Sequence, residues 1–460
     1  MIVLKEGNRR IPRWNRKVFA VAGGLTNYKK FCPEMKLEEQ VMVAFRQMLE
    51  DNDLRLSPVE TKGLINFIAC GNFSDHFQDQ LLCEAKVTDY LGLDPMYDIG
   101  IKTGGATGGS TILTAAMAIA SGYADVALAV GWERMSEVDT RTGNYYIANA
   151  ACKDFETRLS RIYAAYYAPM AIRFSWTYNL SEQIRAKVAV KNHLYAYYSP
   201  YSQQPGKYTV QDILNSPMST YPLRFLECCA MTDGAACMLL CDEKTAYKLT
   251  DKPCELFIAG GSHTLRVADR RHMEIPLLPH ETPDMYKDLS KKKGRWPGFE
   301  SFAASRFAAY FAYRMAGITD PLEEFDLVET HDAFTISDIQ TYGDIGLRPY
   351  GQETDYIESG DAYFGGKCPA NLSGGLIGTM HAVGATGIFQ GVECLWQLHG
   401  KYDKFHGDPK IWESFGKKKP EDWKSLQVPN AKQALWISHA GVGSHVTAGI
   451  LRKAFEGGNV

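Results

Sequence analysis

Three histidines lie where predicted strands or loops meet helix entries, and such positions face ligands in α/β proteins. His331 stands in ETHDAF after a buried apolar run, His381 in MHAVGATG before a glycine-rich turn, and His439 in SHAGVGS beside flexible backbone. An imidazole holds or releases protons near neutral pH and donates hydrogen bonds to a developing oxyanion. We therefore predict that these histidines transfer protons and stabilise negative charge.

A glycine-rich turn, TGGATGGST at 103–111, is the second candidate for chemistry. Its glycines allow backbone N–H groups to converge at the N-terminus of the following helix, which favours negative charge. The phosphate-loop pattern GxxxxGK(S/T) is absent, and no acidic ribose ligand follows a GxGxxG pattern. An oxyanion site for a thioester carbonyl is the alternative that stays open.

These candidates must be positioned by alternating helices and strands. Apolar residues at helical spacing predict helices over 37–52 and 110–122, the second closed by Gly122 as a C-terminal cap. The short, almost continuously apolar runs 63–70 and 124–131 predict strands that are covered on both faces. The fold class is therefore α/β, with helices packed on both faces of the sheet.

The same order of elements occurs twice along the chain. A helix and a strand lead to CGNF and, much later, to HDAF, and aligning Phe73 with Phe334 superposes Cys70 on His331. In each half a glycine-rich turn then enters a helix, as GGATGGSTILTAA and as VGATGIFQGVE. One duplicated α/β unit explains this order better than two unrelated domains.

The segment between the halves, roughly 135–250, is rich in aromatic residues, with the runs NYY, YAAYYAPM, FSWTY and LYAYYSPYS. Aromatic residues at helical spacing commonly pack in a core, yet their concentration in one insertion also fits the lining of a site for a large flat ligand. The predicted contacts with such a ligand are Tyr166, Tyr167 and Phe334.

Composition excludes several classes of protein. Lys and Arg number 50 against 53 Asp and Glu, and this net charge of −3 offers no basic surface for nucleic acid. No uncharged apolar run approaches the length of about 18 residues that predicts a membrane span. Eleven cysteines, none in a CxxC pair, argue against a metal site and for reduced thiols in a cytoplasmic protein.

Taken together, these segments resemble the thiolase superfamily, and specifically its sterol-carrier-protein-type and archaeal branch. The similarity covers GGATGG with its helix, ASGYADVALAVGWERMSE, DILNSPMSTYPLRFLECCAMTDGAA, VETHDAF, NLSGGLIGTMHAVGATG and HAGVG. The resemblance implies two duplicated βαβαβαββ halves in five layers, α-β-α-β-α, with an aromatic-rich loop domain inserted in the first half. The implied boundaries are 1–134 with 225–255 for the first half, 135–224 for the inserted domain and 256–460 for the second half.

The resemblance also implies roles for single residues. His381 matches the family histidine that activates the nucleophilic thiol and helps to form an oxyanion hole, and His331 supports the same hole. Gly441 matches a glycine whose N–H contributes to a second oxyanion hole, together with the N–H at the nucleophile position, Gly105. His439 stands where familiar thiolases have the cysteine that shuttles the proton of the substrate α-carbon, and it could act there as a different base.

One departure from the family pattern changes the expected mechanism. The family nucleophile is the cysteine of a Cys-Ala-Ser-Gly or Cys-Ala-Thr-Gly tetrad, and this chain reads Gly105-Ala106-Thr107-Gly108. Glycine has no side chain to acylate, so the ordinary ping-pong reaction cannot run through position 105.

Three explanations stay open. A displaced cysteine, either Cys70 at a strand edge or Cys83 on a predicted helix over 76–90, attacks the substrate and leaves room for a bulkier acyl group. Alternatively, the protein is a retro-aldolase on a β-hydroxyacyl-CoA, similar to thiolase-like steroid side-chain aldolases that also have Gly at this place but lose the histidines matching His331 and His381. In the third explanation the chain is a non-catalytic, CoA-binding scaffold subunit.

The resemblance implies thiolytic cleavage, by CoA, of a bulky and aromatic β-ketoacyl-CoA such as benzoylsuccinyl-CoA, a substrate of anaerobic toluene degradation. CoA is then a co-substrate, and no cofactor is bound permanently. The branch further implies a homodimeric core and a small partner subunit with a zinc ribbon and an OB fold, which would hold the zinc.

Overall fold

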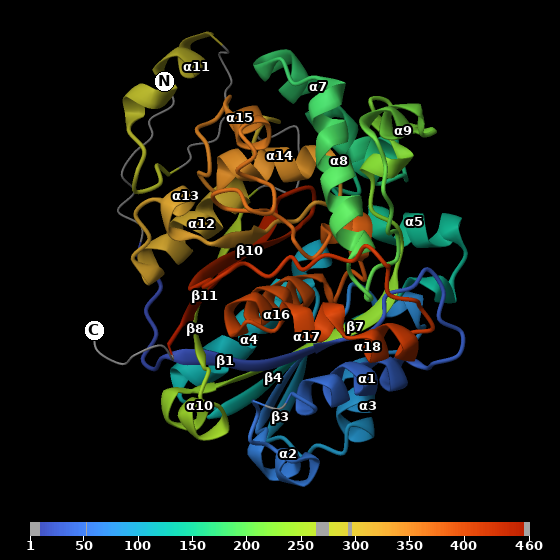
Figure 1. The fold of residues 1–460 in the computed structure, drawn as a ribbon, viewed down its shortest axis with the longest axis vertical. Coiled ribbons are helices and arrows are strands. Elements are labelled where there is room, and N and C mark those ends of the chain that lie inside the picture. Colours follow the sequence, from blue (N-terminus) through green and yellow to red (C-terminus); the bar gives the residue numbers. More distant parts are fainter. Residues whose placement is uncertain (1–9, 52, 264–275, 293–296, 455–460) are drawn as a thin grey trace.

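The computed structural model describes residues 10–51, 53–263, 276–292 and 297–454, and its first half follows the predicted alternation of strands and helices (Figure 1). The elements of this half are β1 (Val18–Leu25), α1 (Leu37–Leu49), α2 (Pro58–Leu64), β2 (Phe67–Gly71), α3 (Cys83–Tyr90), β3 (Tyr97–Ile101), α4 (Thr107–Ser121), β4 (Val126–Arg134), β7 (Asp233–Asp242) and α10 (Glu243–Leu249).

A mostly helical insertion separates β4 from β7, and its two long helices, α7 and α8, lie at the upper right of Figure 1. It contains α5 (Thr140–Ala148), α6 (Glu156–Leu159), α7 (Ala164–Tyr178), α8 (Glu182–Tyr197), α9 (Val210–Asn215) and a small hairpin of β5 (Met218–Thr220) and β6 (Leu223–Arg224).

The second half repeats the strand–helix alternation with longer connections. Its elements are β8 (Cys254–Ser262), α11 (Lys287–Lys292), α12 (Ala303–Ala316), α13 (Pro321–Glu324), β9 (Leu327–Glu329), α14 (Thr335–Asp344), α15 (Glu353–Glu358), α16 (Thr386–His399), α17 (Tyr402–Gly407), α18 (Pro409–Ser414), β10 (Gln433–Ala440) and β11 (His445–Lys453).

Strands of both halves form one mixed sheet, in the order β3-β2-β4-β7-β1-β8-β11-β10-β9. The halves meet where β1 pairs antiparallel with β8 through only two residue pairs, Phe19 with Glu255 and Ala20 with Cys254. Counted outward from this seam, β1, β7, β4 and β2 match β8, β11, β10 and β9 in order. The predicted duplication of one α/β unit is therefore confirmed.

Helices α4 and α16 form the central layer between the two half-sheets, and each of them contacts strands of both halves. Helices α1 and α10 cover the outer face of the first half-sheet, and α12 covers that of the second. Strands β1, β4 and β7 are buried along nearly their whole length because helices cover both of their faces. The result is the arrangement of five layers, α-β-α-β-α, that the resemblance implies, with the aromatic-rich segment inserted in the first half.

Glycines let the two central helices approach each other at their N-termini. A Cβ atom at Gly108 would lie 2.5 Å from the backbone nitrogen of Gly387, and one at Gly387 would lie 2.2 Å from that of Gly109. The glycines of the 103–111 turn thus serve close helix packing, in addition to any effect on nearby charge.

The predicted helix over 76–90 is wrong in its first part. Only a short 3₁₀ turn, Asp75–Phe77, precedes α3, which begins at Cys83. Asp79 and Leu82 between them have φ angles of 48° and 54°, and this left-handed backbone cannot continue a right-handed helix.

No helix within the described ranges combines the length and the apolar character needed to cross a bilayer.

Candidate active site

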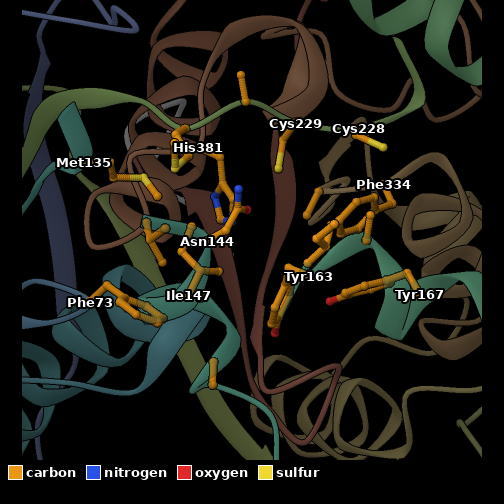
Figure 2. A pocket seen from close by; sticks show the side chains of 18 of the residues that line it. Phe73, Met135, Asn144, Ile147, Tyr163, Tyr167, Cys228, Cys229, Phe334 and His381 are labelled. Atoms are coloured by element: carbon orange, nitrogen blue, oxygen red, sulfur yellow. The ribbon is translucent and has the colours of Figure 1, made fainter. Parts of the chain in front are cut away.

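A cavity of about 210 Å³ lies where both halves and the insertion meet (Figure 2). Its walls are mainly apolar and aromatic, and Figure 2 shows His381 on the side opposite Phe334 and Tyr163. Apolar and aromatic lining residues include Phe73, Met135, Ile147, Ile162, Tyr163, Tyr167, Phe334 and Val383, and polar ones include Asn144, Ser219, Cys229, His331, His381 and His439.

All three predicted histidines line this cavity. His331 is the second residue after β9, His381 precedes the first turn of α16, and His439 is the penultimate residue of β10. The ring of His331 lies between the other two, with centroid distances of 5.0 Å to His381 and 4.2 Å to His439. The structure therefore brings together groups that are 108 residues apart in the sequence (439 − 331 = 108).

The imidazoles of His331 and His381 favour the neutral form. Burial lowers the pKa of His381 to about 4. Burial also lowers the pKa of His331 well below its usual range, and the neighbouring His439 and His381 lower it further. Both rings are thus uncharged at neutral pH and offer one N–H each for hydrogen bonding.

A threonine from the same helix entry orients His381. Nδ1 of His381 lies 2.9 Å from Oγ1 of Thr386, and the backbone N–H of His381 donates to Oγ1 of Thr232 at 3.1 Å. When Thr386 donates its hydroxyl proton to Nδ1, the neutral ring carries its proton on Nε2. His381 can then donate that N–H to an oxyanion in the cavity.

Asp332 connects the loop of His331 to the segment before His381. Its carboxylate accepts the backbone N–H groups of Leu376 at 2.6 Å and Ile377 at 3.3 Å, at the start of the π-helical turn Gly375–Thr379. It also accepts the side-chain amide of Asn192 from α8 at 2.6 Å. The insertion therefore holds the histidine loops in place through one buried carboxylate.

His439 is enclosed by aromatic side chains. Its Nε2 lies 2.9 Å from the hydroxyl oxygen of Tyr167, which comes from α7. The ring of Tyr167 packs at 4.4 Å on that of Phe334, and the ring of Phe302 lies 4.8 Å from that of His439. Tyr167 and Phe334, both predicted ligand contacts, are thus brought into the cavity wall.

Gly105 borders the cavity at a place where no side chain fits. A Cβ atom at this position would lie 2.4 Å from the carbonyl oxygen of His439 and 3.5 Å from Nε2 of His331. The end of β10 therefore occupies the space that a nucleophilic side chain at position 105 would need.

The predicted alignment of the two halves is wrong by one residue in β2. Gly105 abuts the carbonyl of His439, and Gly384 abuts that of Trp132, each at a Cβ distance of 2.4 Å, so Trp132 of β4 matches His439 of β10. In the strand registers, Phe67 pairs with Ala127 and Leu327 with Ala434, so the first-half residue that matches His331 is Gly71.

Cys70 consequently points to the other face of β2, because successive side chains of a strand alternate. It packs in the outer core with Cys83, Phe45 and Val87. Burial raises the pKa of the Cys70 thiol, and it raises that of Cys83 to about 11. Neither thiol is among the residues that line the cavity, and the Cys83 thiol donates to the carbonyl of Gln80 at 3.2 Å.

Tyr163 and Cys229 are among the cavity residues that sequence reasoning missed. Tyr163 lies one helical turn before Tyr167 and lines the cavity, whereas the predicted Tyr166 does not and instead donates its hydroxyl to the carbonyl of Ser160 at 2.5 Å. Spacing of four residues along the helix was the signal for Tyr163. Figure 2 shows the sulfur of Cys229 pointing into the cavity, and no spacing rule indicates this residue.

Gly441 begins the turn between β10 and β11 with φ of 59°, and Val442 and Gly443 follow with φ of 57° and 76°. A β-branched residue in this region is strained, and the Val442 N–H donates to the hydroxyl of Tyr163 at 3.3 Å. The insertion thus holds this turn as well.

Among the described residues, no group of three or more His, Cys, Asp or Glu side chains is arranged to hold a metal ion.

Models of known families match most of the chain. The thiolase N-terminal domain matches residues 20–209, and the thiolase C-terminal domain-like model matches residues 292–408. Solved structures that share the fold over 96% of the chain include the Ltp2-ChsH2(DUF35) aldolase, with a TM-score of 0.71, 20% identity and 98% of its chain covered. They also include human mitochondrial 3-ketoacyl-CoA thiolase in complex with CoA, with a TM-score of 0.63, 14% identity and 99% of its chain covered.

Similar proteins include the acetyl-CoA acetyltransferase of Methanothermobacter thermautotrophicus, which is 32% identical over 81% of this chain and 90% of its own length. Human sterol carrier protein 2 is 28% identical over 96% of this chain and 73% of its own length. Benzoylsuccinyl-CoA thiolase subunit BbsB of Thauera aromatica is 27% identical over 68% and 73%. The chain therefore belongs to the thiolase family of acyl-CoA C-acyltransferases.

Proposed function

We propose that this enzyme cleaves the carbon–carbon bond of a β-ketoacyl-CoA that carries a bulky aromatic acyl group, with benzoylsuccinyl-CoA as the reference substrate. The observation that carries the proposal is the meeting of His331, His381 and His439 in a cavity whose other walls are mainly apolar and aromatic. Such walls favour an aromatic acyl group over acetyl. The similarity to a benzoylsuccinyl-CoA thiolase subunit points the same way.

In the proposed reaction, the sulfur of CoA forms a bond to the β-carbonyl carbon, and the bond between the α- and β-carbons breaks. The electron pair of the broken bond becomes the enolate of the departing thioester. Neutral His331 and His381 donate hydrogen bonds to the enolate oxygen. The proton lost by the CoA thiol is finally gained by the α-carbon, so the reaction is balanced without any further reactant.

The nucleophile in this proposal is CoA itself. A Cβ atom at Gly105 would collide with the carbonyl of His439 at 2.4 Å, which leaves no room for an acylated side chain there. The thiols of Cys70 and Cys83 are buried away from the cavity, and burial raises their pKa, which disfavours the thiolate. The N–H groups of Gly105 and Gly441 are proposed to hold the β-carbonyl oxygen as it becomes an oxyanion.

The test is to mix the protein with benzoylsuccinyl-CoA, first without and then with free CoA, and to map covalent adducts by peptide mass spectrometry. We expect no adduct, and cleavage to benzoyl-CoA and succinyl-CoA only when CoA is added. A benzoyl group on Cys83, Cys70 or Cys229 would instead establish a displaced nucleophile. Faster cleavage of acetoacetyl-CoA than of benzoylsuccinyl-CoA would contradict the substrate class.

A retro-aldol reaction is the second candidate, because the lack of a side chain at Gly105 suits a cleavage that needs no covalent thiol. It predicts breakdown of a β-hydroxyacyl-CoA in the absence of CoA. If neither a β-ketoacyl-CoA nor a β-hydroxyacyl-CoA is consumed, the remaining proposal is a CoA-binding scaffold.

A homodimer is proposed through the free edge of the first half-sheet. Strand β3 ends the sheet and, among the described strands, pairs only with β2. Met96 and Tyr97 at this edge are 59% and 53% exposed, and the nearby Leu81 and Leu82 are both more exposed than these two residues. An exposed apolar strand edge favours pairing with another chain. Light scattering should therefore give twice the monomer mass, and Tyr97→Lys should lower it.

A small zinc-ribbon and OB-fold partner is proposed as well. Two similar proteins bear names that denote assemblies, one a thiolase subunit and the other an aldolase with a DUF35 protein. The zinc is proposed to belong to this partner, and a cytoplasmic location is proposed from the eleven cysteines, all of which are free thiols. Purification from the native source followed by metal analysis of the complex tests both statements about the partner.

A further inference from the structure

A tyrosine hydroxyl and an imidazole form a pair inside the cavity. The hydroxyl oxygen of Tyr167 lies 2.9 Å from Nε2 of His439. Both residues line the cavity although each is only 1% exposed to solvent. One belongs to the insertion and the other to the second half, so this pair forms only in the complete fold.

Packing fixes the pair in one geometry. The Tyr167 ring packs at 4.4 Å on Phe334, and it lies nearly parallel to the His439 ring, at an interplanar angle of 15°. On its other side, His439 contacts His331 at a centroid distance of 4.2 Å. A hydroxyl held this way against an imidazole can pass its proton without any movement of the protein.

The remaining histidines are occupied with another task. His381 is oriented by Thr386, and His331 sits between the two other imidazoles. Both are placed to donate hydrogen bonds to an enolate oxygen, and a neutral imidazole donates only one. The transfer of the α-proton therefore requires a further group.

We propose that Tyr167 is the catalytic residue that exchanges a proton with the substrate α-carbon, and that His439 stores the proton between the two transfers. This inference rests on the proposed carbon–carbon bond cleavage and names the acid and base of that step. It also gives the hydroxyl of Tyr167 a role that ring stacking on an aromatic substrate would not require.

The proton balance closes within the pair. As the CoA thiol attacks, its proton passes to the oxygen of Tyr167, and the original hydroxyl proton moves to Nε2 of His439. The resulting imidazolium lies beside His331, where positive charge stabilises the enolate that forms next. After the carbon–carbon bond breaks, Tyr167 gives its proton to the α-carbon and recovers the proton from Nε2. Both residues end in their starting state.

The test uses a half-reaction that does not depend on the true substrate. The purified protein is incubated with acetyl-CoA in D₂O without free CoA, and exchange of the α-hydrogens is followed by mass spectrometry. We expect exchange by the wild type and a rate about 10²–10⁴ lower in Tyr167→Phe, which keeps the ring but lacks the hydroxyl. His439→Gln should lose as much, and the double variant no more than either single variant, because the two residues act as a unit.

Tyr197→Phe is the matched control, since it removes a tyrosine hydroxyl that bonds to Asp422 at 3.0 Å outside the cavity. It should keep the wild-type rate. Exchange at the wild-type rate in Tyr167→Phe, losses that multiply in the double variant, or no exchange by the wild type would each overturn the inference. Exchange that depends on Tyr167, in a protein that fails to cleave benzoylsuccinyl-CoA, would retain the pair and reject the proposed substrate.

Discussion

The two halves of this protein build the same turn at the N-terminus of a central helix and use it differently. In the first half, Oγ1 of Thr107 accepts the backbone N–H of Thr103 at 2.9 Å, which only closes the turn. In the second half, the matching Thr386 contacts Nδ1 of His381 at the same distance of 2.9 Å. The same backbone turn therefore makes a structural contact in the first half and orients an imidazole in the second half.

The ends of the matching strands also carry side chains of different chemistry in the two halves. The residues that match His331 and His439 are Gly71 and Trp132, neither of which can transfer a proton under these conditions. The first half contributes Gly105 and apolar walls, and the second half contributes the histidines. Duplication thus supplied two equivalent edges, and the chemistry is concentrated at one of them.

Among the variants that compare the two halves, the largest effect is expected from removing the imidazoles that have no counterpart in the first half. His331→Ala and His381→Ala should each lower kcat by about 10²–10³, because each deletes a donor to the enolate oxygen. Circular dichroism should show that both variants fold. A folded His381→Ala protein with the wild-type rate would sink the assignment of the enolate site.

A smaller effect is expected at Gly105, where the two halves touch. Gly105→Ala should lower the free energy of unfolding by about 1–3 kcal/mol, because the added methyl group collides with the carbonyl of His439. Urea denaturation measures this change. In the control Gly63→Ala no atom lies within 4 Å of the new Cβ, and this helical position should gain about 0.5–1 kcal/mol.

Gly105→Cys tests the same close contact between position 105 and the end of β10. It should be destabilised like Gly105→Ala, and it should not become acylated by benzoylsuccinyl-CoA. A stable benzoyl adduct on the new cysteine would show that the end of β10 yields easily, contrary to the structure.

The matching threonines give the next prediction. Thr386→Val should lower kcat about 10-fold, because His381 loses the hydroxyl that lies 2.9 Å from its Nδ1 and orients the ring. Thr107→Val should leave kcat nearly unchanged and affect only stability, since its hydroxyl serves the backbone. Equal losses of kcat in the two variants would remove the functional difference between the halves.

The smallest effect concerns pH. The pKa of His381 in the folded protein, about 4, lies below the unfolded value of about 6.5, so the folded state binds fewer protons. The stability that this histidine contributes is complete above pH 6.5 and is lost as the pH falls toward 4. Between pH 6.5 and 5 this amounts to about 2 kcal/mol. Urea denaturation at a series of pH values gives the free energy of unfolding of the wild type and of His381→Gln. Between pH 6.5 and 5, this free energy should fall less steeply with decreasing pH in the variant than in the wild type.

The sequence was sufficient to predict those site residues that can be recognised within a short stretch of the chain. The three histidines stand next to glycine-rich or strand-end segments, and Gly105 interrupts a tetrad, so each is visible in a short window. The duplication was visible as well, because its glycine-rich turns share the letters GATG.

What depended on exact register or on distant contacts could not be predicted. A shift of one residue in β2 moves a side chain to the opposite face of the sheet, which is why Cys70 was expected near the site and lies in the outer core. The contact of Asn192 with Asp332 spans 140 residues, and no periodicity encodes it. Tyr166 and Tyr163 differ only in helical phase, and the aromatic run itself does not fix that phase.

The thin seam between β1 and β8 has a consequence for how the protein unfolds. Two residue pairs cannot by themselves hold the half-sheets together, yet α4 and α16 each pack on strands of both halves. If either half were alone, its central helix would lose the partner helix and the strands that cover it, and the face that carries Gly108 or Gly387 would be exposed. The duplicated units should therefore melt in a single cooperative transition and be unable to survive as separate fragments, despite the internal symmetry that makes them look separable.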